Sequence, residues 1–117
     1  MNARTLNPKS ADNNYLLRLL NGNTEMKGVV LNEIFQSLPK CLSEINSSIR
    51  KKDSLGVITF CARAKSAFSM LREEKLANSF QRIEDFARNG EMSSAEILFT
   101  TEFADTIVKL QLIQKAV

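Results

Sequence analysis

The stretch REEKLANSFQRIEDFAR, residues 72–88, carries apolar side chains at the spacing of an α-helix. Leu76, Phe80 and Ile83 are four and three residues apart, so they fall on one face, and polar residues occupy the other. Asn89-Gly90 follows and predicts the helix end, because both residues accept a left-handed backbone conformation. The inward residues expected of this helix are Leu76, Phe80, Ile83 and either Phe86 or Ala87.

Residues 23–50 repeat the pattern over a longer stretch. Asn23 or Thr24 can cap its start, because both side chains accept hydrogen bonds from the first free backbone amides. Pro39 lies inside this run. Since proline removes a backbone donor and crowds the preceding turn, we expect a kink between Phe35 and Pro39 within one helix. The inward residues expected are Met26, Val30, Ile34, Leu38, Cys41 or Leu42, Ile45 and Ile49.

A third helix is expected between these two. Residues 50–52, Arg-Lys-Lys, place cations at the end of the long helix, where they complement its dipole. Asp53 or Ser54 can then cap a helix that runs to about Met70. Its expected inward residues are Leu55, Ile58, Cys61, Ala64 and Phe68.

The two ends of the chain each add a helix. Ser93 or Ser94 can start a last helix, and Asp12–Leu20 forms a short first one that the turn at 21–23, Asn-Gly-Asn, brings to an end. Residues 1–11 are expected to be a flexible tail. The apolar stripe of the first helix is Tyr15, Leu16, Leu19 and Leu20. The last helix is expected to bury Ile97 or Leu98, Thr101, Ala104, Val108 and Leu112 or Ile113.

The fold class follows from this periodicity. No stretch alternates apolar and polar residues as a half-buried strand does, so the fold is expected to be all-α. With only four glycines and two prolines, the helices should be long. Long amphipathic helices joined by short connections predict an antiparallel four-helix bundle with an additional short N-terminal helix, as a single domain over residues 1–117.

The composition argues against catalysis. The chain contains no histidine, which excludes histidine-based acid–base chemistry and any zinc site that needs imidazole. Adjacent acids at 73–74 and 84–85 splay about 100° apart on a helix, so we interpret them as solvated charges. Cys41 and Cys61 lie in apolar patterns without a C-x-x-C spacing and are interpreted as reduced core thiols. We expect no enzyme activity, no metal and no cofactor.

The charge and hydropathy of the sequence restrict the kinds of partner that we expect. The net charge is only +3, the positive residues are dispersed, and the chain has no tryptophan and one tyrosine, which disfavours nucleic-acid binding. The apolar runs are far shorter than the ~20 residues that span a bilayer, and the polar start MNARTLNPKSADNN does not resemble a signal peptide. These features predict a cytoplasmic protein without membrane contact, which we expect to be a monomer.

The outward face of the expected third helix combines small and basic residues. Ala62 lies three residues before Lys65. Ser69 and Arg72 continue this line at helical spacing. Small residues let another protein approach closely, and basic ones neutralise carboxylates or a phosphoryl group. The strip therefore fits an acidic partner, although a solvated face with incidental charge has the same composition. The candidate partner-binding residues are Thr59, Ala62, Arg63, Lys65, Ser66, Ser69 and Arg72.

Four segments of the chain, in order, are similar to the motifs of one known family. YLLRLLNGNTEM at 15–26 is similar to its short opening helix, glycine-containing turn and second-helix start. FQSLP at 35–39 is similar to its Phe-x-x-x-Pro-like stretch, and IRKKDSL at 49–55 to its connection before the third helix. RIEDFARNG at 82–90 is similar to its L-E-x-x-A-R-x-G end of the fourth helix. Over nearly its whole length the chain thus resembles the histidine-containing phosphotransfer (HPt) domain of two-component phosphorelays.

The family signature, His-x-x-Lys-Gly followed by small residues, is matched here by FCARAKSAF at 60–68. The resemblance places Ala62 at the phosphoacceptor histidine, Lys65 at the lysine and Ser66 at the glycine. A methyl group is not a nucleophile, so this chain is not expected to accept a phosphoryl group. Two explanations stay open: a naturally degenerate HPt domain, or a working phosphotransfer protein in which alanine has replaced the acceptor histidine.

The resemblance implies a bacterial phosphorelay protein that docks a response-regulator receiver domain, such as that of a hybrid sensor kinase, through the third helix. In a histidine-bearing form, imidazole would attack the receiver's aspartyl phosphate and Lys65 would stabilise the phosphoryl oxygens. In this chain only docking is expected. The alternative is a helical adaptor or structural bundle unrelated to phosphotransfer, with its interface on another face. A basic nucleic-acid binder, with steeply salt-dependent affinity, is a third reading.

Overall fold

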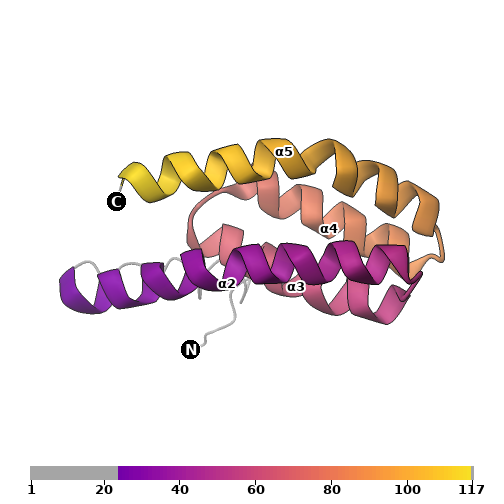
Figure 1. The fold of residues 1–117 in the computed structure, drawn as a ribbon, viewed down its shortest axis with the longest axis horizontal. Helices are drawn as coiled ribbons and strands as arrows, with labels where there is room; N and C mark the ends of the chain where they lie inside the picture. The colour runs from indigo at the N-terminus through magenta and orange to yellow at the C-terminus, as the bar shows by residue number, and fades with distance from the viewer. Residues whose placement is uncertain (1–23, 117) are drawn as a thin grey trace, which may run out of the picture.

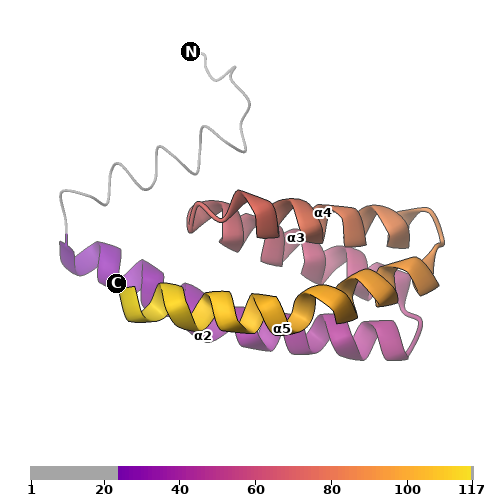
Figure 2. The same cartoon turned by 90° about the horizontal axis from the view of Figure 1, so that it is seen from above.

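The computed structural model describes residues 24–116, which form four α-helices and no strand. The helices are α2 (Thr24–Arg50), α3 (Ser54–Met70), α4 (Glu74–Arg88) and α5 (Met92–Ala116). They run antiparallel in chain order, and α3 packs against both α2 and α4 while α5 packs against α4 and α2 (Figures 1 and 2). The all-α four-helix bundle is confirmed. The helix expected at Asp12–Leu20 and the tail at 1–11 lie outside the described residues.

Most of the core comes from one face of each of α2, α3 and α4, largely as the periodicity predicts, and α5 adds Ala95, Phe99 and Leu110. On α2 the buried apolar residues are Ile34, Leu38, Leu42, Ile45 and Ile49. On α3 they are Val57, Cys61, Ala64 and Phe68, and on α4 Leu76, Ala77, Phe80, Ile83 and Ala87. α2 runs unbroken through Pro39, whose side chain is exposed. The kink expected there stays a prediction.

A chain of aromatic rings joins three of the helices. Phe80 of α4 stacks on Phe68 of α3 with the ring centroids 5.4 Å apart. It meets Phe99 of α5 edge-on at 6.3 Å, and Phe99 in turn contacts Phe103 at 5.5 Å. Phe80 and Phe68 are fully buried. Offset and edge-on ring pairs contribute stability beyond the burial of apolar area. The row of aromatic rings therefore helps to fix the position of α5 against α3 and α4.

The inward face of α5 is not the one predicted. Thr101, Ala104, Val108 and Leu112 are exposed, and so is Ile97, whereas Leu98 and Ile113 are half-buried. The residues that pack inward are instead Ala95, Phe99, Thr106 and Leu110. α5 carries apolar side chains on all sides, so its period does not select one face. The contacts with α4 and α2 make that selection.

The three connections share one backbone geometry. In each, the second residue after the helix has a positive φ: 56° at Lys52, 61° at Arg72 and 76° at Gly90. The next residue's N–H donates 2.8 Å to the carbonyl five residues earlier, as Asp53 to Ser48, Glu73 to Phe68 and Glu91 to Phe86. This is the Schellman motif, which satisfies carbonyls left free at a helix end. The acidic third residue then precedes the next helix, so each connection both ends one helix and starts another.

At the first connection the predicted cap is confirmed. The Gly56 N–H donates 3.1 Å to Oδ1 of Asp53, which immediately precedes α3.

Lys52 adopts a left-handed conformation that suits glycine better than lysine. We expect Lys52→Gly to stabilise the protein by about 0.5–1 kcal/mol, because it removes a steric penalty of the Cβ in this conformation. Lys52→Ala, which keeps the Cβ, is the control and should give no such gain. Urea unfolding followed by circular dichroism measures both, and equal effects of the two variants would contradict the interpretation.

Candidate partner-binding site

The outward face of α3 is a continuous strip of mostly small side chains. Thr59 and Ser66 are exposed, and Ala62 and Ser69 are half-buried on the same side, opposite the buried residues of the helix. Leu55 was expected to point inward, and that prediction is wrong: its side chain is 73% exposed. It precedes Thr59 by one turn, so it adds an exposed apolar side chain to the strip. We call the residues Leu55, Thr59, Ala62, Ser66 and Ser69 the α3 strip.

The three predicted cationic residues do not form one line. Arg63 is exposed on the flank facing α2, and its guanidinium lies 5.2 Å from the centroid of the Phe60 ring. Lys65 lies on the other flank, facing α4. Arg72 is not on α3 at all, because the helix ends at Met70 and Arg72 belongs to the connection. Arg72, which helical spacing placed in line with Lys65, therefore lies off that line, and Arg63 and Lys65 lie on opposite flanks of α3.

Lys65 is held by α4 rather than free in solvent. Its side chain is only 14% exposed, with Nζ 3.5 Å from Oε1 of Glu84. Nζ also donates a hydrogen bond to Oε1 of Gln81. The ammonium is therefore already compensated by a carboxylate. It can still attract a phosphoryl group beside Ala62, one turn earlier on α3, but it would share its charge with Glu84.

Glu84 is the functional candidate that the sequence reasoning missed. The 84–85 pair was expected to be solvated, yet Glu84 is 4% exposed, and only Asp85 is at the surface. Arg88, four residues on, donates to Oε2 from Nε at 3.0 Å and from Nη2 at 2.8 Å. Glu84 lies one turn after Phe80 on the inward face of α4. That position and the i, i+4 pairing with Arg88 were the available signals.

One oxygen of Glu84 is left without a hydrogen bond. Oε1 is buried and accepts none from any described residue, although it lies 3.5 Å from Lys65 Nζ. A buried acceptor without a donor is costly, and the Lys65 ammonium, 3.5 Å away, offsets part of that cost through its charge.

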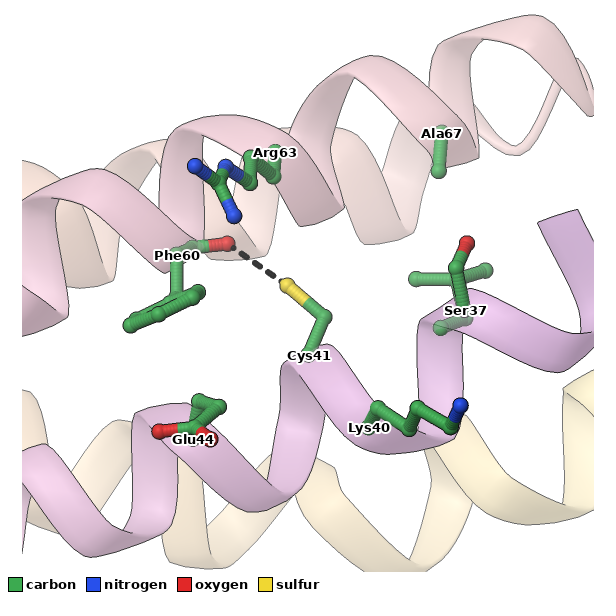
Figure 3. Close-up of a pocket in the computed structure, with 8 residues that line it drawn as sticks. Ser37, Lys40, Cys41, Glu44, Phe60, Arg63 and Ala67 are labelled. Atoms are coloured by element: carbon green, nitrogen blue, oxygen red, sulfur yellow. Dashed lines mark hydrogen bonds between the residues drawn. The ribbon is translucent and has the colours of Figure 1, made fainter.

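On the opposite flank of the strip, α2 and α3 enclose a shallow cavity of about 240 Å³ (Figure 3). The Cys41 thiol faces it and donates 3.0 Å to the Phe60 carbonyl. Charged groups at its edge include Lys40, Glu44 and Arg63, so the cavity has an apolar interior and a mixed-charge rim. It lies directly beside the exposed side chain of Arg63 and so adjoins the α3 strip.

Both cysteines are free thiols, as predicted. Burial raises the pKa of the Cys61 thiol above its ordinary value of 9.0; Cys41 and Glu84 raise it further, and Lys65 opposes them. Burial also raises the pKa of Cys41, with Arg63 opposing it. A raised thiol pKa means that the folded protein keeps a proton that the unfolded chain releases above pH 9, so the contribution of Cys61 to stability is fully present below pH 9 and is lost progressively as the pH rises above it.

We therefore expect the unfolding free energy to fall above pH 9, with Cys61 contributing at most about 1.4 kcal/mol per pH unit. Urea unfolding of the parent and of Cys61→Ala between pH 7 and 10.5 measures this contribution. The variant loses packing at every pH, but its slope above pH 9 should be shallower. Parallel slopes would show that Cys61 does not titrate differently on folding.

Comparison with models of protein families, with curated proteins and with solved structures found no match to this chain. Within residues 24–116 no group of three or more cysteine, aspartate and glutamate residues is arranged to hold a metal ion. In the same part of the chain no helix is both long enough and apolar enough to cross a bilayer. The site is therefore interpreted from its own geometry.

Proposed function

We propose that this chain is an HPt-like signalling module of the bacterial cytoplasm that docks a response-regulator receiver domain through the α3 strip. The observation that carries the proposal is the strip itself: small, accessible side chains around Ala62, with Arg63 on one flank and the Lys65–Glu84 pair on the other. Such a surface lets an acidic phosphorylation pocket approach the helix closely. The resemblance to the HPt signature at 60–68 supports the same helix as the docking element.

Position 62 limits what the module can do. A histidine there would attack the aspartyl phosphate of the receiver, forming an N–P bond as the P–O bond to the aspartate breaks. Its second ring nitrogen would carry the N–H donor of the neutral imidazole. Alanine offers neither a nucleophile nor a donor. This chain therefore binds the receiver without accepting its phosphoryl group.

The docking prediction is tested with the isotope-labelled chain and a panel of receiver domains. We expect amide shifts to cluster at Thr59, Ala62 and Ser66. Arg63→Glu should weaken binding by about tenfold or more, because it sets a carboxylate against an acidic partner. Arg82→Glu makes the same charge change on the exposed side of α4 and is the matched control.

Equal losses of affinity in the two variants would mean that net charge, not the strip, governs binding. Shifts on α5, or none with any receiver, would contradict the proposal. Lys65→Glu is unsuitable as a probe of binding, because it would place a second carboxylate beside the buried Glu84 and destabilise the fold.

The Ala62→His variant distinguishes the two explanations for the alanine at position 62. If alanine has replaced a working histidine, Ala62→His should become labelled on incubation with a phosphorylated receiver, whereas the parent chain should not. A folded Ala62→His variant that binds the receiver and stays unlabelled would identify a natural docking module instead.

The adaptor alternative has one observation in its favour. Ile97, Val108 and Leu112 are 67%, 54% and 58% exposed on the outer side of α5. Exposed apolar side chains aligned along a helix can form a protein interface. If α5 carries the function, Val108→Arg would abolish partner binding and Arg63→Glu would not, which is the reverse of the outcome expected for the α3 strip.

A further inference from the structure

One side of α5 presents a line of uncharged side chains to the outside of the bundle. Ile97, Val108 and Leu112 are each more than half exposed, and the smaller Thr101 and Ala104 between them are exposed as well. Successive members lie three or four residues apart, so they share one face of the helix. This face is opposite the buried side of α5, which packs against α4 and α2 (Figure 1). We call these five residues the α5 line.

The spacing of the α5 line suits contact with another helix. From Ile97 to Val108 the steps are four, three and four residues, as in residues that meet along two paired helices. Thr101 and Ala104 are small enough to let a second helix approach closely, and the other three members supply apolar area. None of the five carries a charge, so pairing along them would leave no charge buried without a partner.

The charged residues of α5 divide by sign along the helix. Its acids, Glu96, Glu102 and Asp105, all precede its bases, Lys109 and Lys115. A second α5 lying antiparallel would therefore set the acidic part of each helix beside the basic part of the other, whereas a parallel one would set like charges together. The α5 line is thus complementary to itself about a two-fold axis, which is the commonest symmetry of homodimers. A partner of another sequence would need the same division of charge, whereas a second copy has it already.

We propose that two copies of this chain pair antiparallel through the α5 line, with Ala104 of each copy against Val108 of the other. In this register Asp105 of one copy comes close to Lys109 of the other at the edge of the contact. The side chain of Lys109 is 49% exposed beside Glu73, so it remains accessible to a second carboxylate. Such a dimer replaces the monomer expected from the sequence and does not depend on the proposed function. It leaves the α3 strip of each copy open, because α3 packs against α2 and α4.

The first test is self-association of the full chain. Contact along one helix is a small interface, so we expect a dissociation constant of about 10–100 µM. Sedimentation equilibrium should then show the mass rising with concentration from that of one chain to that of two. Val108→Arg should raise the dissociation constant by at least about tenfold, because both copies would place a charge in the apolar contact.

Val29→Arg is the matched control for this variant. Val29 lies on α2 and is 56% exposed, against 54% for Val108. It should leave the dissociation constant unchanged. Since both valines are exposed, neither substitution should move the midpoint of thermal unfolding in dilute solution by more than about 2 °C.

Two reciprocal variants test the charge pairing. Asp105→Lys and Lys109→Glu should each associate with itself less tightly than the parent chain does, because each sets like charges across the contact. A mixture of the two restores an acid opposite a base at both edges of the contact. It should associate at least about fivefold more tightly than either variant alone.

The direction of the helices is tested in a sample that mixes labelled and unlabelled parent chains. Filtered NOEs should join the Ala104 methyl group of one molecule to a Val108 methyl group of another. NOEs between the Val108 residues of two molecules, without these, would indicate parallel helices and contradict the proposal. NOEs from the α5 line to residues 1–23 of the same molecule would also contradict it, because the chain would then cover its own helix.

Three further results would overturn the proposal. One is a single mass at all concentrations up to about 0.5 mM. Another is an equal effect of Val108→Arg and Val29→Arg on the dissociation constant, which would place the contact on another face. The third is a mixture of Asp105→Lys and Lys109→Glu that associates no better than the separate variants.

Discussion

Glu84→Ala is expected to destabilise the protein by about 3–5 kcal/mol. The substitution removes a 4%-exposed carboxylate and leaves the Lys65 ammonium, whose side chain is only 14% exposed, without its anionic partner. It also opens a cavity on the inward face of α4. Urea unfolding followed by circular dichroism measures the loss, and Asp85→Ala, next to it but exposed, should change stability by about 0.5 kcal/mol or less.

The effects of substituting Lys65 and Glu84 on stability should not be additive. Lys65→Met with Glu84→Leu replaces both charges by apolar side chains of similar length, so the double variant should recover most of the stability that either single change loses. Arg88 can then turn to water, because its side chain is already 56% exposed. If the double variant is as unstable as the sum of the two single variants, Lys65 and Glu84 are not energetically coupled and the described geometry is wrong.

This pair also matters for the proposed function. A receiver that places a phosphoryl group beside position 62 competes with Glu84 for the same ammonium. The folded double variant should therefore keep the α3 strip but bind a phosphorylated receiver no more tightly than an unphosphorylated one. In the parent chain, phosphorylation should favour binding.

Phe80→Ala is the second large effect, with an expected loss of about 3–5 kcal/mol. Phe80 is fully buried and contacts the rings of both Phe68 and Phe99, so its removal leaves a cavity where α3, α4 and α5 meet. Thermal unfolding followed by circular dichroism measures the loss. Phe103→Ala is the control: its ring is 40% exposed at the end of the same aromatic chain.

For Phe103→Ala we expect a loss of about 1 kcal/mol. Similar losses for the two variants would mean that α5 is not anchored through Phe80. We also expect Phe80→Leu to keep much of the stability, since it fills part of the cavity with apolar atoms. A Phe80→Leu variant as unstable as Phe80→Ala would show that ring geometry, rather than filled volume, is what matters.

The sequence identified α4 well because its polar and apolar residues separate cleanly. Leu76, Phe80 and Ile83 fall on one face, and the structure buries them. The same reasoning failed on Glu84, because sorting residues by polarity assigns every carboxylate to the solvent-exposed face. Its burial depends on Lys65 and Arg88, and Lys65 belongs to another helix.

The candidate site was located from the sequence only in outline. Helical spacing put Thr59, Ala62, Ser66 and Ser69 on the outward face of α3, and they do lie there. Leu55 was misassigned because it lies on the outward face with Thr59, and Val57 takes the inward position one turn before Cys61. Arg72 was misassigned because helical spacing was extended past Met70, where the backbone turns left-handed.

The sequence by itself determined the helical class, the helix start after Asp53, the helix end near Gly90 and most of the inward faces of α2, α3 and α4, because these depend on local period and on short-range backbone hydrogen bonds. Only the tertiary structure decided which face of α5 is buried and that Glu84 pairs with Lys65 inside the bundle. A helix that is apolar on all sides can bury any one of its faces with a similar gain in stability. A charged side chain can be buried only where another helix supplies the opposite charge.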